Sequence, residues 1–228
     1  MTVHQIAIPI VCFAFIVAYH GYEFVRVGET RKLFAQVRKG WVDNCVLTGQ
    51  QAVNTTRDYI RVASALGGSS IIIAIFVAGV ASGHFADCAN SGTGCTQAEV
   101  LVLVKLGTLV GLMCTIFFLF TQCARFAIHF SFMINTREMN SVPLPPSLMT
   151  RVFDHAHWYY SVGIRAFFVT IPVVSWLFTS WCLLGVTPVY LLVVHGIESS
   201  AFMSEPLLEL KAKQQEQQPE QPQQQDVT

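Results

Sequence analysis

The sequence predicts an all-α fold: an integral membrane bundle of four transmembrane helices with amphipathic or interfacial helical extensions. Hydrophobic residues make up 53% of the 228 residues and charged residues only 12%, whereas soluble domains carry about 25% charged residues. The mean hydropathy is +0.49. Four apolar runs each reach the roughly 20 residues that a helix needs to cross a hydrocarbon core of about 30 Å. They cover residues 6–25, 62–83, 100–122 and 161–184. Runs this long and continuous favour helices over barrel strands in lipid.

The first apolar run is interpreted as a membrane span rather than as a secretory signal. The residues before it carry no Lys or Arg, and no small-residue cleavage site follows it. No Arg-rich presequence is visible either, so a mitochondrial location would require internal targeting or prior removal of a leader. Residues 1–203 are expected to form one membrane domain. Residues 204–228 are rich in Gln and Pro and form a polar tail that cannot bury a core.

The segments between the spans are expected to extend the membrane helices. Residues 42–59 lack proline and repeat apolar positions, which predicts a helix that lies along the membrane or leads into the second span. The third span should continue past the membrane almost to Asn135, and the Pro-rich stretch 142–146 ends it. Pro172 predicts a kink in the fourth span, and residues 185–188 are expected to interrupt that helix.

Basic residues are concentrated in two of the connecting segments. Seven Lys or Arg lie between residues 26 and 61, and Arg125, Arg137 and Arg151 follow the third span, whereas residues 84–99 contain none. The positive-inside rule therefore places both basic segments on the cytoplasmic or matrix side of the membrane. With four spans, both termini and the segment 84–99 face the opposite side.

Cys88 and Cys95 share the short segment on that opposite side, where several compartments permit disulfides. A disulfide and two free thiols both fit the sequence. No third ligand stands beside this pair, and the chain lacks a zinc-type motif, so no metal ligand is predicted. The seven histidines are scattered, although a pair on facing helices could ligate haem.

Two GxxxG motifs predict helix packing. Gly79 and Gly83 lie in the second span, and Gly107 and Gly111 lie in the third. Small residues let helix backbones approach closely in lipid, so the two motifs are expected to pack against each other within the chain, or less readily against another molecule.

Arginines recur at one end of the spans and suggest a site for anionic phospholipid. Arg57, Arg61, Arg125 and Arg165 would lie near one interface, with Trp158 at the same level in an aromatic belt. Ordinary positive-inside flanking accounts for such charges as well. Basic pockets between helices on this side bind lipids such as cardiolipin, and Arg makes bidentate phosphate contacts. 

Lys105 lies inside the third span. It is expected to reach the nearby interface or to make a structural polar contact.

Four short sequence elements occur in the chain in an order that can be compared with known families. They are AVNTTRD at 52–58, KL at 105–106, CARFAIHFSFMIN at 123–135 and WYYSVGIRAFF at 158–168. Together they resemble the four-span membrane family filed as domain of unknown function 599. The likeness covers about residues 19–195, and GIRAFF is its most specific part. On this resemblance, Arg57, Arg125 and Arg165 match recurring basic positions of the family, which has no established activity to transfer.

The sequence favours a membrane protein without catalytic activity. It has no phosphate-binding loop, no nucleophile elbow and no paired carboxylates within the spans. We expect an accessory or structural subunit of a larger membrane complex, preferably a respiratory-chain assembly of the mitochondrial inner membrane. Its expected partners are membrane lipids and other membrane subunits, and the zero net charge gives no reason to expect nucleic acid. No cofactor other than a structural phospholipid such as cardiolipin is expected.

Two alternatives remain at the level of sequence. One is a stand-alone transporter or channel for a small anion, lined by Arg165, Arg125 and Lys105. The other is a haem- or metal-binding membrane oxidoreductase.

Overall fold

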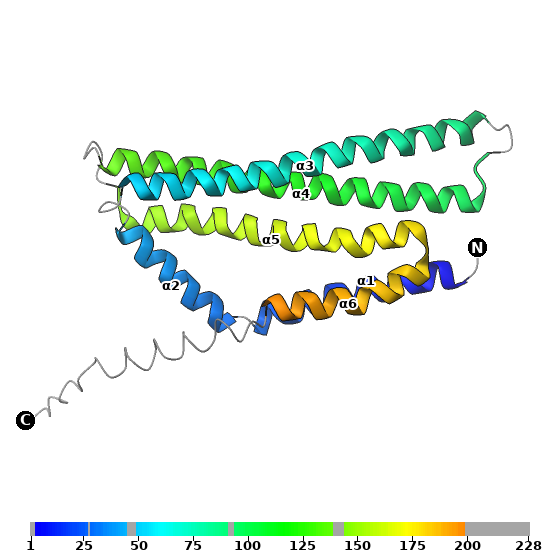
Figure 1. The fold of residues 1–228 in the computed structure, drawn as a ribbon, viewed down its shortest axis with the longest axis horizontal. Helices are drawn as coiled ribbons and strands as arrows, with labels where there is room; N and C mark the ends of the chain where they lie inside the picture. Colours follow the sequence, from blue (N-terminus) through cyan, green and yellow to red (C-terminus); the bar gives the residue numbers. More distant parts are fainter. Residues whose placement is uncertain (1–2, 27, 45–48, 91–93, 139–143, 199–228) are drawn as a thin grey trace, which may run out of the picture. The chain divides into compact units, whose positions relative to one another are not determined.

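The computed structural model describes residues 3–26, 28–44, 49–90, 94–138 and 144–198, and every regular element within these ranges is an α-helix (Figure 1). The all-α fold class is therefore confirmed. The helices are α1 (Val3–Arg26), α2 (Gly28–Asn44), α3 (Gly49–Asn90), α4 (Gln97–Glu138), α5 (Pro146–Phe178) and α6 (Ser180–Glu198). Contacts divide the chain into two compact units, Met1–Thr187 and Pro188–Thr228.

Five of the described helices are long and apolar enough to cross a membrane, which fits an integral membrane protein. They are α1, α3, α4, α5 and α6, whereas α2 is polar. The structure contains no membrane, so the count of four crossings stays a prediction. That count also decides on which side of the membrane the C-terminus lies. The predicted tail, residues 204–228, falls outside the described residues.

The expected interruption of the last apolar stretch at residues 185–188 is wrong, because α6 continues through Gly185 and Pro188. The chain breaks at Thr179, whose backbone is extended with φ −163° and ψ 155°. The Thr179 hydroxyl accepts a hydrogen bond of 3.3 Å from the backbone N–H of Trp181. This is the N-cap arrangement that satisfies a donor at the start of a helix. The predicted fourth span therefore covers the end of α5 and the beginning of α6.

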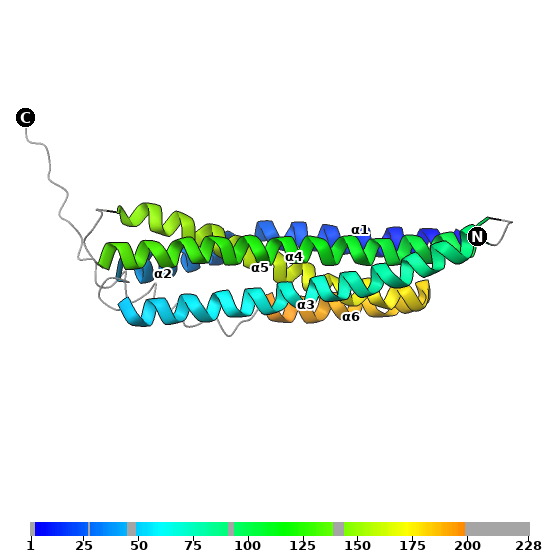
Figure 2. The same cartoon turned by 90° about the horizontal axis from the view of Figure 1, so that it is seen from above.

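Helices α3, α4 and α5 pack side by side in alternating directions (Figures 1 and 2). Phe120 of α4 is fully buried between the other two. A Cβ atom added to Gly67 of α3 would lie 3.2 Å from the Cβ of Phe120, and one added to Gly163 of α5 would lie 3.2 Å from its ring. Phe120 therefore fills space that exists because each neighbouring helix has a glycine at this level.

The predicted packing between the two GxxxG motifs is wrong. Gly79, Gly83, Gly107 and Gly111 are all exposed, and a Cβ added to any of them would meet no neighbouring helix within 4 Å. The buried face of α3 recurs every seven residues from Ala63, and at 100° per residue Gly79 and Gly83 fall on the opposite face. Both motifs therefore lie on the outside of the bundle.

Helices α3 and α4 are each 42 residues long, or about 63 Å at 1.5 Å per residue, which is twice the thickness of the hydrocarbon core. As expected, a helix leads directly into the second predicted span, but it is α3, which begins at Gly49, and residues 42–44 belong to α2 instead. Helix α4 extends beyond the membrane as expected and ends at Glu138. The start of α3, the end of α4 and the start of α5 carry most of the charged residues of these helices. We call this the charged end of the bundle, and we infer that it extends beyond the hydrocarbon. The opposite end is formed by the end of α3, the start of α4 and the end of α5.

Candidate functional site

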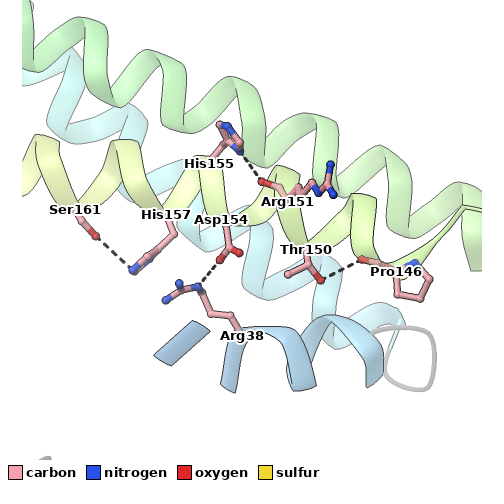
Figure 3. A network of polar contacts seen from close by, with 8 residues as sticks. All are labelled: Arg38, Pro146, Thr150, Arg151, Asp154, His155, His157 and Ser161. Atoms are coloured by element: carbon pink, nitrogen blue, oxygen red, sulfur yellow. Dashed lines mark hydrogen bonds and ion pairs between the residues drawn. The ribbon is translucent and has the colours of Figure 1, made fainter. Parts of the chain in front are cut away.

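At the charged end, α2 is joined to α5 by an ion pair (Figure 3). Arg38 Nε donates a hydrogen bond of 2.8 Å to Asp154 Oδ1, and the two side chains are 20% and 38% exposed. His157 and Ser161 continue along α5 on the same side, with Nε2 and Oγ 3.4 Å apart. The pair is partly shielded from water, so it is stronger than a fully exposed ion pair.

An aromatic layer underlies this ion pair and holds α2 in place. The ring of Trp41 in α2 lies 5.2 Å from Phe153 of α5 and 5.8 Å from Phe130 of α4, and the latter two are 4.8 Å apart. Val42, next to Trp41, is fully buried in the same cluster. Burial of this surface is the main force that docks α2, since aromatic side chains dominate the energetics of such contacts.

The arginines of the predicted lipid site point outward where they lie on α3. Arg57 and Arg61 are both exposed, and Arg61 Nη1 donates to Asp58 Oδ1 at 3.4 Å across one turn of the helix. An exposed pair of this kind contributes little to stability. These two arginines therefore remain accessible to solvent or to a lipid headgroup.

The other predicted lipid-site residues are spread along the bundle. Arg125 of α4 is exposed between the fully buried Cys123 and Ala127, and Trp158 of α5 is exposed as well. Arg165 is half-buried on α5. Because Gly163 lies level with Phe120, the residue spacing along the two helices places Arg165 about 10 Å further from the charged end than Arg125. Arg61 and Arg125, by contrast, are at nearly the same level. No described contact joins the four arginines into one pocket.

A groove of about 350 Å³ lies between α4 and the beginning of α5 at the charged end. Arg125 precedes His129 by four residues and Phe132 by seven, so these three side chains share one face of α4. The groove is lined mainly by apolar side chains, with two polar ones among them: Phe126, Phe132, Met133, Leu144 and Val152, together with His129 and Thr136. An apolar floor with a cation one turn away suits an amphiphile or an apolar segment of another protein.

Comparison with known families decides the identity of the chain. The model of the family described as "Protein of unknown function, DUF599" matches residues 6–201. The chain belongs to the DUF599 family. The resemblance drawn from the four sequence elements is therefore confirmed, although the four-span detail is not. No curated protein and no solved structure matches this DUF599 chain.

Lys105 of the DUF599 protein lies at the opposite end of the bundle and makes a structural polar contact. Its side chain is only 8% exposed, and Nζ lies 5.6 Å from the centre of the Trp176 ring. Arg125 is twenty residues further along α4 and is exposed. The structure therefore does not bring together the cations that an anion path was expected to use.

One histidine of the DUF599 protein, His155, makes contacts within the bundle. His155 Nδ1 lies 2.8 Å from the carbonyl oxygen of Arg151, and its ring is 5.5 Å from Phe126 (Figure 3). Within the residues that the structure describes, no three His, Cys, Asp or Glu side chains are grouped so that they could hold a metal ion. Two-histidine haem ligation requires its own test.

Cys88 at the end of α3 and Cys95 just before α4 are placed as a disulfide pair. A bond here would close the turn between the two longest helices.

Arg38, Asp154 and Trp41 were not among the residues that sequence reasoning selected. Their partners are far away along the chain, 116 residues for the ion pair. The only local signal is the pattern of α2, a charged helix with aromatic and aliphatic residues on one side.

Proposed function

We propose that this DUF599 protein is a non-catalytic subunit of a larger membrane assembly, and that its charged end binds anionic phospholipid and a partner subunit. The preferred setting is a respiratory-chain assembly of the mitochondrial inner membrane. There, basic surfaces on the matrix side meet cardiolipin.

Exposed apolar side chains beyond the hydrocarbon carry this proposal. Ile128 and Phe132 of α4 are exposed, Phe132 by 65%. They follow the predicted end of the third span at residue 122 by six and ten residues, or about 9 and 15 Å along the helix. With the span ending at residue 122, lipid tails would not cover them. Contiguous apolar surface that neither lipid nor the chain itself covers is typical of a protein contact.

The position of Arg125 supports the lipid part of the proposal. It lies three residues past the predicted span, at the depth of lipid headgroups, and its guanidinium carbon is 5.1 Å from the centre of the Phe126 ring. Trp158 is exposed on the neighbouring helix. A cation and an indole at this depth form the usual anchor for a phosphate headgroup.

Native mass spectrometry of the protein isolated from its source membrane in mild detergent tests both parts. The wild type should carry a stoichiometric partner subunit and bound anionic lipid. Phe132→Ala should lose the partner, whereas Phe85→Ala should keep it, because Phe85 is equally exposed, at 63%, but lies at the opposite end of α3. Arg125→Ala should lower lipid occupancy. Lys39→Ala, which changes an exposed lysine of α2, should not.

Three results would contradict the proposal. A wild-type chain isolated without any stoichiometric partner would refute membership of an assembly. If Phe132→Ala retained the partner as well as Phe85→Ala does, the partner would not dock at Phe132. Lipid occupancy equal to that of the wild type in both Arg125→Ala and Arg165→Ala would refute the lipid site.

A further inference from the structure

We propose that the opposite end of the bundle contains a buried oxyanion site formed by Lys105 of α4, Trp176 of α5 and the first turn of α6. The ligand is a phosphate group, either free or as the phosphodiester of a lipid headgroup. This site is separate from the charged end and does not depend on the function proposed above.

Two donors carried by largely buried residues meet at this site. Lys105 is 8% exposed and Trp176 is 7% exposed. The ammonium of Lys105 lies 5.6 Å from the centre of the indole ring, and Trp176 Nε1 is buried without a hydrogen-bond partner among the described residues. A cation–π contact attracts the ammonium but leaves its charge uncompensated. Buried groups of both kinds are normally paired, because leaving them unpaired is costly.

The nearest acidic residue along α4 is already engaged elsewhere. Glu99 lies six residues before Lys105, and its Oε2 accepts hydrogen bonds from the backbone N–H of Thr96 at 2.7 Å and from the Thr96 hydroxyl at 2.8 Å. It thereby forms a capping box at the start of α4. No ion pair joins Lys105 to an acidic side chain in the part of the chain that the structure describes.

The start of α6 adds backbone N–H donors beside these side chains. Helix α6 begins at Ser180, four residues after Trp176, and Leu183 in its first turn packs in one cluster with Trp176 and Cys12. The Thr179 hydroxyl accepts from the N–H of Trp181, and the Thr179 carbonyl accepts from the N–H of Leu183. The N–H groups of Ser180 and Cys182 have no acceptor within the helix, and their partial positive charge favours an anion. Ser180 is itself buried, which shields this partial charge from water.

The combination of donors selects a phosphate group. An ammonium, an indole N–H and a helix N-terminus are all donors, so their ligand must be an acceptor with several oxygen atoms, as phosphate is. Lys105 lies five residues inside the predicted start of the third span at residue 100, about 7.5 Å from that boundary. A lysine side chain can reach a headgroup phosphate across this distance.

Two variants and two matched controls test the site in purified, delipidated full-length protein. Trp176→Phe keeps an aromatic ring against Lys105 but removes the N–H, and Lys105→Met removes the charge at similar length. Trp181→Phe changes a tryptophan of α6 whose ring is exposed and whose backbone N–H is bonded to Thr179, so it stands outside the site. Lys39→Met changes an exposed lysine of α2. The melting temperature is measured against inorganic phosphate at constant ionic strength. In a second arm, native mass spectrometry counts the lipids retained after exposure to nanodiscs containing phosphatidylglycerol.

Free phosphate as ligand predicts that phosphate raises the melting temperature of the wild type and of both controls. Trp176→Phe and Lys105→Met should then bind at least about tenfold more weakly, as expected when a hydrogen bond to a charged group is lost. A lipid ligand predicts no response to phosphate, but a retained lipid that both site variants lose and both controls keep. Identical behaviour of all the proteins in both arms would overturn the proposal. Should Lys105→Met fail to fold, Trp176→Phe alone decides between these outcomes.

Discussion

Replacing Gly163 by leucine should destabilise the bundle far more than the same change at Gly79. A Cβ atom at Gly163 already lies 3.2 Å from both Cε1 and Cζ of Phe120. Phe120 has little room to move away, because its side chain is fully buried and its ring packs edge-on against Tyr160 at a centroid distance of 6.0 Å. Inserting extra carbons into a packed core costs about 1–3 kcal/mol, and leucine adds four of them, so we expect about 3 kcal/mol.

Thermal unfolding of the purified protein in detergent measures this effect. A loss of about 3 kcal/mol corresponds to a fall in melting temperature of about 6–12 °C for a protein of this size. Gly79→Leu should change the stability by less than about 1 kcal/mol, because its position is open and leucine is the better helix former. The two substitutions are chemically identical, so their difference isolates the packing environment.

A second variant checks that Phe120 is the cause. Phe120→Ala alone should cost about 3–5 kcal/mol, because it leaves a cavity at a fully buried position. In that background Gly163→Leu should cost much less, since the leucine can occupy the vacated space. Equal losses at Gly163 and Gly79, or an undiminished loss at Gly163 in the Phe120→Ala background, would refute this account of helix packing.

Three further predictions follow from the contacts at the two ends of the bundle. Arg38→Met and Asp154→Asn should each weaken the docking of α2 on α5. A double-mutant cycle of thermal stability should give a coupling energy of about 1 kcal/mol, since the ion pair is only partly buried. Additive effects of the two substitutions would show that the ion pair is not formed. Alkylation without reductant, followed by peptide mass mapping, should leave Cys88 and Cys95 unmodified, and modification of both would show free thiols. Thr179→Ala should cost about 1 kcal/mol through loss of the α6 cap, whereas Thr179→Ser should not.

The helical fold could be predicted from the sequence because length and apolarity decide it locally. The extension of α4 beyond the membrane follows from the apolar run after residue 122. The proline-free, periodic segment 42–59 predicts helix before the second span, but not that α2 ends at Asn44 and α3 begins at Gly49. The break at Thr179 was harder to predict. Gly185 and Pro188 are the stronger breakers in water, but membrane helices tolerate both residues, so a Thr-Ser cap became the effective signal.

The packing glycines could not be identified from motif spacing alone. GxxxG spacing places Gly79 and Gly83 on one face of a helix but does not say whether that face meets another helix. The direction is fixed by the buried residues around Phe120, and these select Gly67 and Gly163. Gly163 opens the GIRAFF element, so the most specific part of the family likeness contains a residue that the core requires.

The candidate site could be predicted only where its members are neighbours in sequence. Arg57 and Arg61 share a helix face one turn apart, and a pattern of this kind is readable. Arg38 and Asp154 come from separate helices, and nothing in their local sequence pairs them. The aromatic layer beneath them is likewise assembled from α2, α4 and α5.

The order of contacts along the chain has a consequence for biosynthesis. Helix α3 packs against α4, and α4 packs against α5, so each long helix meets its partner as soon as the next one leaves the ribosome. Helix α2 is made before all three, yet Asp154, its ion-pair partner, is synthesised 116 residues after Arg38. Docking of α2 is therefore a late event in maturation. In a nascent chain stalled before α5, the side of α2 that packs on α5 would be exposed to chaperones and proteases. Quality control could therefore recognise the incomplete protein by this surface.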